Sequence, residues 1–337
     1  MMQTGLFDWQ TRFEQLDKGG DPLVKLNSVV KWETFRRLLK KVRDPNRKSA
    51  AGRKPFDVMI MFKILILQSL YNLSDDQTEF QIRDRLSFMR FLGLSVSDTV
   101  PDAKTIWLFR EQLTEAGLIE KAFAKFDDFL RTHGFAAKKG QIVDASIIQT
   151  PKQRNSRDDN KRIKNGEVPE AWTETKKRQK DTEARWTKKN GKNYYGYKNH
   201  VDVDVKHKFI RRYAVTDASV HDSNVFETLL DASNSSRDVW ADSAYRSQDK
   251  LDELESRGFR EHLQRKGCRN KPLSEKEKKG NRTRSKVRSR VEHVFGVQAQ
   301  RAGDLLLRTI GLVRAKAKIG LRNLAYNIDR YSTLAMA

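Results

Sequence analysis

The chain lacks most features that mark secreted and zinc-dependent proteins. Among 337 residues there is one cysteine, Cys268, which excludes an intramolecular disulfide framework and a paired-cysteine metal site. Six scattered histidines form no HExxH motif, so zinc catalysis of that kind is not indicated. The start, MMQTGLFDWQ, shows neither a basic nor an apolar leader region, and no secretory signal is predicted. A reducing cytoplasm is therefore the expected compartment.

Long apolar runs are also scarce. The best one, from Val58 to Leu70, is interrupted by Lys63 and Gln68 and is shorter than the roughly 20 residues that a membrane-spanning helix needs. A membrane partner is therefore not expected. Hydrophobic residues still make up 37% of the chain, and six Trp with seventeen Phe indicate packed interiors rather than disorder. At about 150 residues per domain, the length suggests two domains.

Acidic residues are few relative to basic ones, because 44 Asp and Glu stand against 67 Lys and Arg, giving a formal net charge of +23. The excess lies in three stretches, residues 31–54 (+8), 151–200 (+8) and 265–290 (+10), and the rest of the chain is −3. One such stretch alone would be equally consistent with a solvated face. Three separate stretches, each beside a structured segment, favour a nucleic-acid surface.

Residues 23–133 are predicted to be helical. Residues 55–71 are apolar around most of the helix circumference, which is typical of a buried central helix, and Pro55 suits its first turn. Ser74, Asp75 and Asp76 are candidate N-caps for a following helix that runs to Arg85. The sequence therefore predicts an all-α amino-terminal half.

A further helix is predicted to begin at Pro101-Asp102, and its apolar side carries Ile106, Phe109 and Leu113 at helical spacing. The opposite side is expected to expose four polar residues: Lys104, Thr105, Arg110 and Glu111. Exposed after a tight turn, these groups suit a helix-turn-helix reader of DNA. An ordinary helical hairpin with a polar face explains the pattern equally well.

Strand patterns begin after Gly134. The predicted strands cover residues 141–148, 194–205, 209–216, 238–244 and 259–263, and helices are predicted at 224–232, at 248–257 and from Ser285 onward. This order predicts an α/β or α+β fold with a mixed sheet flanked by helices. Residues 152–192 interrupt it with a basic segment that contains Trp172 and Trp186 but no convincing periodicity. Cations interleaved with aromatic residues favour a functional role for this insertion.

Four acidic residues occupy strand, loop or helix positions where a solvated charge would be unusual: Asp144, Asp222, Asp242 and Glu292. Each alone is explained by a cap or an ion pair. Together, two aspartates on adjacent strands and a glutamate on a packed helix can bind a divalent metal through oxygen ligands, and Mg²⁺ suits such a site. Two ions about 3.5–4 Å apart would activate a water or a 3′-hydroxyl and stabilise the leaving oxygen.

The order of these motifs resembles a known family. The strand with Asp144, the YGYKNH and HDS segments, the DSAYRS strand and the RxxxE helix resemble bacterial insertion-sequence transposases of the DDE type, specifically the InsH-like group. The segments GRKPFDVMIMFKILILQSLYNLSD and VPDAKTIWLFR are similar to that group's amino-terminal domain. The resemblance covers most of the chain and implies an RNase H-like catalytic domain.

The expected organisation has three parts. An N-terminal arm covers residues 1–22, and a helical, helix-turn-helix-like DNA-binding domain covers 23–135. The RNase H-like catalytic domain covers 136–337 and contains the basic insertion 152–192 and the basic stretch 265–290.

The resemblance implies that Asp144, Asp242 and Glu292 form the catalytic triad and hold two Mg²⁺ ions, for which Mn²⁺ would substitute. Arg288, one helical turn before Glu292, would bind a DNA phosphate or orient that carboxylate. Two positions depart from the family pattern, because Ser285 stands where some relatives have tyrosine and Ala299 where they have lysine.

Further DNA contacts are expected from these residues: Lys104, Thr105, Arg110, Trp186, Lys198, Tyr245 and Arg288. Tyr245 would stack on a base or bond a phosphate, and it could equally be a core residue. His221 and Asp222 lie near the active site in this family, which suggests an auxiliary role. A histidine at a helix start is, however, most often a hydrogen-bonding loop residue.

The expected function is transposition in a bacterial cytoplasm, in association with the nucleoid. The enzyme would cut double-stranded DNA at the terminal inverted repeats of its own element and join the freed 3′-hydroxyls to target DNA. Two ends must be brought together, so a dimer or a higher synaptic complex is expected. Two alternatives stay open: a DNA-binding regulator of transposase descent that does not cut, and an RNase H-like nuclease that cuts without joining.

Overall fold

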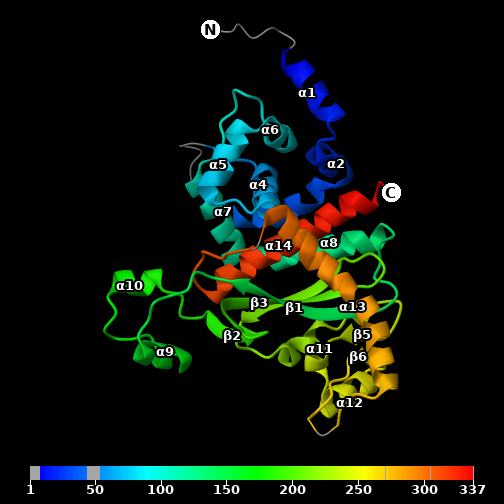
Figure 1. Cartoon of the computed structure of the whole chain (residues 1–337). Coiled ribbons are helices and arrows are strands. Elements are labelled where there is room, and N and C mark those ends of the chain that lie inside the picture. Colours follow the sequence, from blue (N-terminus) through cyan, green and yellow to red (C-terminus); the bar gives the residue numbers. More distant parts are fainter. Residues whose placement is uncertain (1–7, 44–53, 270, 304, 337) are drawn as a thin grey trace. The chain divides into compact units, whose positions relative to one another are not determined.

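The computed structural model describes residues 8–43, 54–269, 271–303 and 305–336 (Figure 1). It contains two compact units, residues 1–125 with 324–337, and residues 126–323. Residues 1–7 of the expected arm and residues 44–53 of the first basic stretch lie outside the described residues. The functional division at residue 135 stays a prediction.

The first unit is helical. Its elements are α1 (Asp8–Lys18), α2 (Pro22–Val29), η1 (Trp32–Phe35), α3 (Arg36–Leu39), η2 (Lys40–Val42), α4 (Val58–Tyr71), α5 (Asp75–Asp84), α6 (Leu86–Leu92) and α7 (Ala103–Glu115). The boundaries between the two units fall within α8 (Leu118–Thr132) and α14 (Leu312–Leu334).

Helix α4 is the buried central helix that the apolar run predicts. Its start differs from the prediction, because Asp57 caps the helix by accepting a hydrogen bond from the Met59 amide (2.8 Å), so Pro55 lies outside. Of the three candidate caps, Ser74 caps α5, and Asp75 and Asp76 lie in its first turn. In the described ranges no single helix combines the length and apolar character needed to cross a membrane; only α4 and α5 taken as one pair, bent by 102°, pass that test.

The second unit is built on a mixed six-stranded sheet. Its strands are β1 (Gln141–Gln149), β2 (Arg185–Lys189), β3 (Lys192–Asp204), β4 (Ile210–Asp217), β5 (Asp238–Ala241) and β6 (Arg260–Leu263). The order is β2-β3-β1-β5-β6, and β4 also pairs with β3. Pairs within β1–β4 are antiparallel, whereas β1 with β5 and β5 with β6 are parallel.

Helices cover both faces of this sheet. Helix α13 (Glu275–Ala302) packs against β1 and β5, while α11 (Phe226–Leu229) packs against β3 and β4, and α12 (Gln248–Ser256) against β6. Figure 1 shows α13 on one side of the sheet and α11 and α12 on the other. The predicted fold class, an RNase H-like mixed sheet flanked by helices and preceded by a helical region, is confirmed.

The basic insertion contains more regular structure than its sequence indicated. Helix α9 (Arg157–Lys164) begins behind a Ser156 cap and α10 (Glu174–Gln179) behind a Thr173 cap, and β2 follows them. Helix α13 starts ten residues before the predicted Ser285, behind a capping box formed by Ser274 and Glu277. These segments were missed because capping residues, rather than an apolar stripe, mark where they begin.

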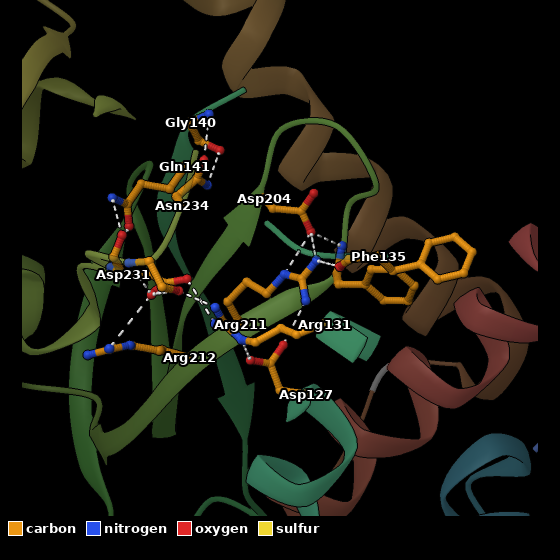
Figure 2. A network of polar contacts seen from close by, with 12 residues as sticks. Asp127, Arg131, Phe135, Gly140, Gln141, Asp204, Arg211, Arg212, Asp231 and Asn234 are labelled. Carbon is orange, nitrogen blue, oxygen red and sulfur yellow. Dashed lines mark hydrogen bonds and ion pairs between the residues drawn. The ribbon is translucent and has the colours of Figure 1, made fainter. Parts of the chain in front are cut away.

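A polar network ties the end of α8 to the sheet (Figure 2). Arg211 of β4 is buried and donates hydrogen bonds to Asp127 (2.7 Å) and Asp204 (2.9 Å). Arg131 donates to Asp127 (2.7 Å) and to Asp231 (3.1 Å). We call these five residues the α8 network; all of them belong to the unit of residues 126–323.

Candidate active site

Two of the predicted catalytic aspartates lie at the same level on neighbouring strands. In the parallel pairing of β1 and β5, Ile142 lies opposite Trp240. Two residues further along the chain stand Asp144, still on β1, and Asp242, directly after the end of β5, and the two are close enough for the charge of Asp242 to act on Asp144. Asp242 directly follows β5 and caps η4 (Ser243–Tyr245), where its Oδ1 accepts a hydrogen bond from the Ala244 amide (2.6 Å).

Asp144 is the more enclosed of the two, with 16% of its side chain exposed. Its Oδ1 accepts a hydrogen bond from the Ala145 amide and its Oδ2 from Arg288, each at 2.8 Å. Burial raises the pKa of Asp144, and the negative charge of Asp242 raises it further. The Ala145 hydrogen bond and the positive charges of Arg288 and Lys189 act in the opposite direction. The site therefore favours a cation beside Asp144.

Helix α13 carries the third predicted ligand, Glu292, together with Arg288, which contacts both Asp144 and Glu292. Val291 and Val294 are fully buried and hold the helix against the sheet. Arg288 projects to Asp144, and its second terminal nitrogen lies 3.6 Å from Glu292 Oε1 one turn along. The Glu292 side chain is 63% exposed. Arg288 lies between it and Asp144 and contacts both.

Within the described ranges, no three His, Cys, Asp or Glu side chains are close enough to hold a metal ion as they stand. The donor set nevertheless fits Mg²⁺. Carboxylate oxygens are its preferred protein ligands, and the pair Asp144 and Asp242 presents them side by side. The guanidinium of Arg288 places a single positive charge at Asp144 Oδ2, and a divalent ion would place a larger positive charge at the same oxygen.

Tyr245 does not lie on a DNA-facing surface. It is 1% exposed and packs against Phe226 with ring centroids 5.2 Å apart, and its hydroxyl has no hydrogen-bond partner among the described residues. Burial raises the pKa of Tyr245, and the charges of Asp222, Asp144 and Asp242 raise it further. The expected DNA contact is therefore wrong for this residue, which lies in the core behind the carboxylates.

Lys198 is also engaged inside the protein. It pairs in register with Ile147 and so points to the face of the sheet opposite Asp144. Its side chain is 12% exposed, and its Nζ donates to the Val220 carbonyl (2.7 Å) and pairs with Asp222 (2.8 Å). In this structure Asp222 and the Val220 carbonyl engage the ammonium group of Lys198, and its contact with DNA stays a prediction.

Two histidines near Asp222, His221 and His200, make hydrogen bonds within the protein. His221 is exposed and caps η3 (Asp222–Val225), where its ring nitrogen lies 2.7 Å from the Ser223 hydroxyl. This is the geometry of a hydrogen-bonding loop residue. His200 is fully buried, contacts Thr216 (2.9 Å), and burial lowers the pKa of His200 to about 4. An auxiliary role for His221 and Asp222 stays a prediction.

The exposed side of α7 differs from the expected one. Arg110 is 3% exposed and donates hydrogen bonds to both carboxylate oxygens of Asp75 (2.6 and 2.8 Å), and Glu111 is also buried. The predicted DNA contact by Arg110 is wrong because this ion pair fastens α7 to α5 in the interior of the unit. Lys104 is exposed and Thr105 is half-buried, so DNA contacts by these two residues stay predictions. Sequence reasoning missed that Trp107 and Leu108 are the large exposed side chains here.

Trp186 in the insertion is accessible. It lies on β2 with 46% of its surface exposed, packs against Tyr195 (5.2 Å between centroids) and has the Lys152 ammonium 5.9 Å from its ring. Lys189, at the end of the same strand, was not among the predicted site residues, although its charge acts on Asp144. The basic composition of the insertion was the signal that could have identified it.

Comparison with known proteins gives two family matches. A family model described as a transposase DDE domain matches residues 136–328, which is more than half of the chain, and one described as a transposase domain (DUF772) matches residues 11–112. Among solved structures, the chain is similar to a piggyBac transposase synaptic complex with hairpin DNA, determined by cryo-EM. That match has 10% sequence identity and a TM-score of 0.47, and covers 94% of this chain and 76% of the other.

Proposed function

Because the chain belongs to the family of transposases with a DDE domain, we propose that it cuts DNA at the ends of its own insertion sequence and joins the freed 3′-hydroxyls to a target. The observation that supports this proposal is that Asp144 of β1 feels the charge of Asp242, which directly follows the parallel neighbouring strand β5. Arg288 and Glu292 approach Asp144 from α13. Both steps are phosphoryl transfers, which need oxygen ligands for a divalent cation at this position.

The proposed roles follow from these contacts. Asp144 and Asp242 would hold the metal, with Glu292 as a third ligand. Bound Mg²⁺ or Mn²⁺, two ions per site, would lower the pKa of the attacking water or 3′-hydroxyl and stabilise charge on the leaving oxygen. Arg288, which donates to Asp144 in this structure, would be available to bind a phosphate with two parallel hydrogen bonds when a cation is held at Asp144.

The partners in this proposal are double-stranded DNA and further copies of the chain. Terminal repeats would be held by the helical region of residues 23–135, including Lys104 and Thr105, and Trp186 would contact DNA near the carboxylates. A dimer or higher synaptic complex would bring the two ends together in the bacterial nucleoid.

The test uses the full chain with duplex DNA carrying the terminal repeats that flank its reading frame, with and without pre-cleaved ends, in Mg²⁺. We expect Asp144→Asn, Asp242→Asn and Glu292→Gln each to lower the rates of cleavage and joining at least about 100-fold, because each removes a metal ligand, while DNA binding is retained. Asp249→Asn, an exposed carboxylate of α12, is the matched control and should retain both activities.

Three outcomes would contradict the proposal. Full activity of Asp144→Asn would refute the catalytic assignment. Cleavage by the unmodified protein without joining of pre-cleaved ends would indicate a nuclease, and binding without any nicking in Mg²⁺ or Mn²⁺ would indicate a regulator.

A further inference from the structure

A cavity of about 340 Å³ lies beyond the carboxyl end of β1. Three segments of the second unit line it: residues 150–154, 179–181 and 307–310. Backbone hydrogen bonds fix its floor, from the Leu307 amide to the Gln149 carbonyl and from the Thr150 amide to the Tyr195 carbonyl, each 2.9 Å. The cavity is thus a built feature of the sheet edge and large enough for a small ligand group.

The lining of the cavity is strongly basic. Its four cations are Lys152, Arg154, Lys180 and Arg308. Its one acid, Asp181, is 3% exposed and its oxygens already accept hydrogen bonds from the Tyr197 hydroxyl (2.7 Å) and from two backbone amides. In the part of the chain that the structure describes, neither Arg154 nor Arg308 is paired with a carboxylate. Such a cavity attracts an anion.

Two polar atoms of the lining also lack partners. Gln153 Oε1 and Thr309 Oγ1 are buried from solvent without a hydrogen-bond partner among the described residues. Buried polar groups are nearly always hydrogen-bonded, so the Thr309 hydroxyl indicates a polar ligand, whereas the Gln153 oxygen can only accept and contributes nothing to binding a phosphate. The Thr309 hydroxyl can donate to a phosphate oxygen.

The cavity opens on the face of the sheet that carries Asp144. The Tyr197 hydroxyl donates to Asp181 of the cavity lining, and Tyr197 pairs in register with Ile148 of β1. Ile148 and Asp144 are an even number of residues apart on β1, so their side chains lie on the same face of the sheet. From Asp144 to Thr150 the strand rises about 20 Å.

Cations mark the path between the two places. The Lys152 ammonium lies over the exposed Trp186 ring on β2, and Lys189 at the end of β2 acts on the charge of Asp144. A positively charged surface therefore runs from the cavity towards the carboxylates. DNA strands are bound along surfaces of this kind, with cations at the phosphates and aromatic rings between them.

We propose that this cavity binds a backbone phosphate of the same DNA whose scissile phosphate lies at Asp144 and Asp242, a proposal that rests on the proposed function. At 3.4 Å of rise per base pair, 20 Å corresponds to about six base pairs. The cavity thus holds the DNA beside the cleavage point and sets its direction across the sheet.

The first experiment measures the affinity of the full chain for terminal duplex DNA as a function of NaCl concentration, without divalent metal. Each phosphate contact contributes about 0.9 to the slope of log K against log salt. Arg154→Gln/Arg308→Gln should lower that slope by about 1–2. The matched control is Lys161→Gln/Lys164→Gln, two exposed lysines of α9 in the same insertion, which remove the same charge and should leave the slope unchanged. Equal slopes for both double variants would overturn the proposal.

The second experiment places single neutral methylphosphonate linkages at successive positions from the cleavage point. We expect the unmodified protein to lose several-fold in affinity when the neutral linkage lies about six base pairs away, and Arg154→Gln/Arg308→Gln to show no further loss there. A loss in the double variant equal to that of the unmodified protein overturns the cavity assignment. Both readouts are binding measurements, so they decide on the cavity even if the cleavage test fails.

Discussion

Asp202 is fully buried although it occupies a polar position in an alternating strand segment. It lies in the alternating segment HVDVD, is fully buried, and neither carboxylate oxygen has a hydrogen-bond partner among the described residues. Burial raises the pKa of Asp202 well above its ordinary value, and the charges of Asp231 and Asp204 raise it further. The nearby cations Arg211 and Arg212 act in the opposite direction without reversing this. Burial therefore favours the neutral form of the Asp202 carboxyl in the folded protein.

This inference gives a pH-dependent prediction. Since the folded pKa lies above the unfolded one, Asp202 stabilises the folded state fully only below about pH 4, and that contribution is lost as pH rises through its folded pKa. Asp202→Asn mimics the neutral acid and lacks this dependence. We expect the variant to match the unmodified protein in free energy of unfolding near pH 4 and to exceed it by about 1–3 kcal/mol at pH 8. Urea unfolding at both pH values measures it, and a constant difference would contradict the assignment.

Single residues also show how far the sequence predicts the site. Asp144 and Asp242 were identified because an acid at a strand position is unusual, and the structure places the two side by side. Arg110, Lys198 and Tyr245 were assigned to DNA because they are polar or aromatic side chains beside motifs. Their burial is decided by partners far away in the chain, such as Asp75 for Arg110, and no local pattern reveals those partners.

At the scale of elements, β3 depends on one glycine. Gly196 has φ +151, and a Cβ at this position would lie 2.2 Å from the Ile148 carbonyl oxygen of β1. The close approach lets β3 pair with β1 and β2 on either side at this point. Only glycine, which has no side chain, permits it.

Gly196→Ala should therefore separate β3 from β1 locally. We expect a loss of about 2–3 kcal/mol in the free energy of unfolding, in the range of overpacked interiors. The matched control is Gly191→Ala at the tip of the β2–β3 hairpin, where φ is +77 and a Cβ meets no atom within 4 Å. A loss at Gly196 no larger than at Gly191 would show that the strand pairing tolerates the extra carbon. Thermal and urea unfolding provide the comparison.

Elements also differ in how well they could be predicted. Strands β1 and β3–β6 have β-branched or alternating patterns and α4 is a continuous apolar run, so these elements were predicted with small errors at their ends, whereas β2 in the basic insertion was missed. The first half of α13 is basic and polar without an apolar stripe, and its start depends on the Ser274–Glu277 capping box. Strand β3 shows alternation typical of a half-buried strand, yet nearly all of its second half is buried because helices cover both faces.

At the scale of the whole molecule, the order of strands and helices was enough to predict the fold class. The net charge of +23 predicted a polyanionic partner but not where it binds. The limits of the second unit were not predictable, because they depend on ion pairs between residues about 80 to 100 positions apart, such as Arg211 with Asp127 and Arg131 with Asp231.

The α8 network gives a prediction for the stability of this unit. Asp127→Ala leaves the fully buried Arg211 with one carboxylate fewer and also removes a partner of Arg131. Breaking a buried ion pair from one side costs about 3–5 kcal/mol, and we expect a loss of that size in urea unfolding. Asp128→Ala, the exposed neighbour on the same helix, should change stability by less than about 0.5 kcal/mol. Equal effects of the two substitutions would mean that the network is not stabilising.

The same network determines where relatives could be recombined. The match to the DDE domain begins at residue 136, yet two members of the network lie upstream of it: Asp127 pairs with Arg211 of β4, and Arg131 pairs with Asp231. A chimera spliced at residue 136 would take the end of α8 from one parent and the sheet from the other. Asp127 and Arg131 would then face residues of a different parent in place of Arg211 and Asp231. Crossovers placed ahead of α8 inherit both halves of the network from one parent and so keep its charges matched.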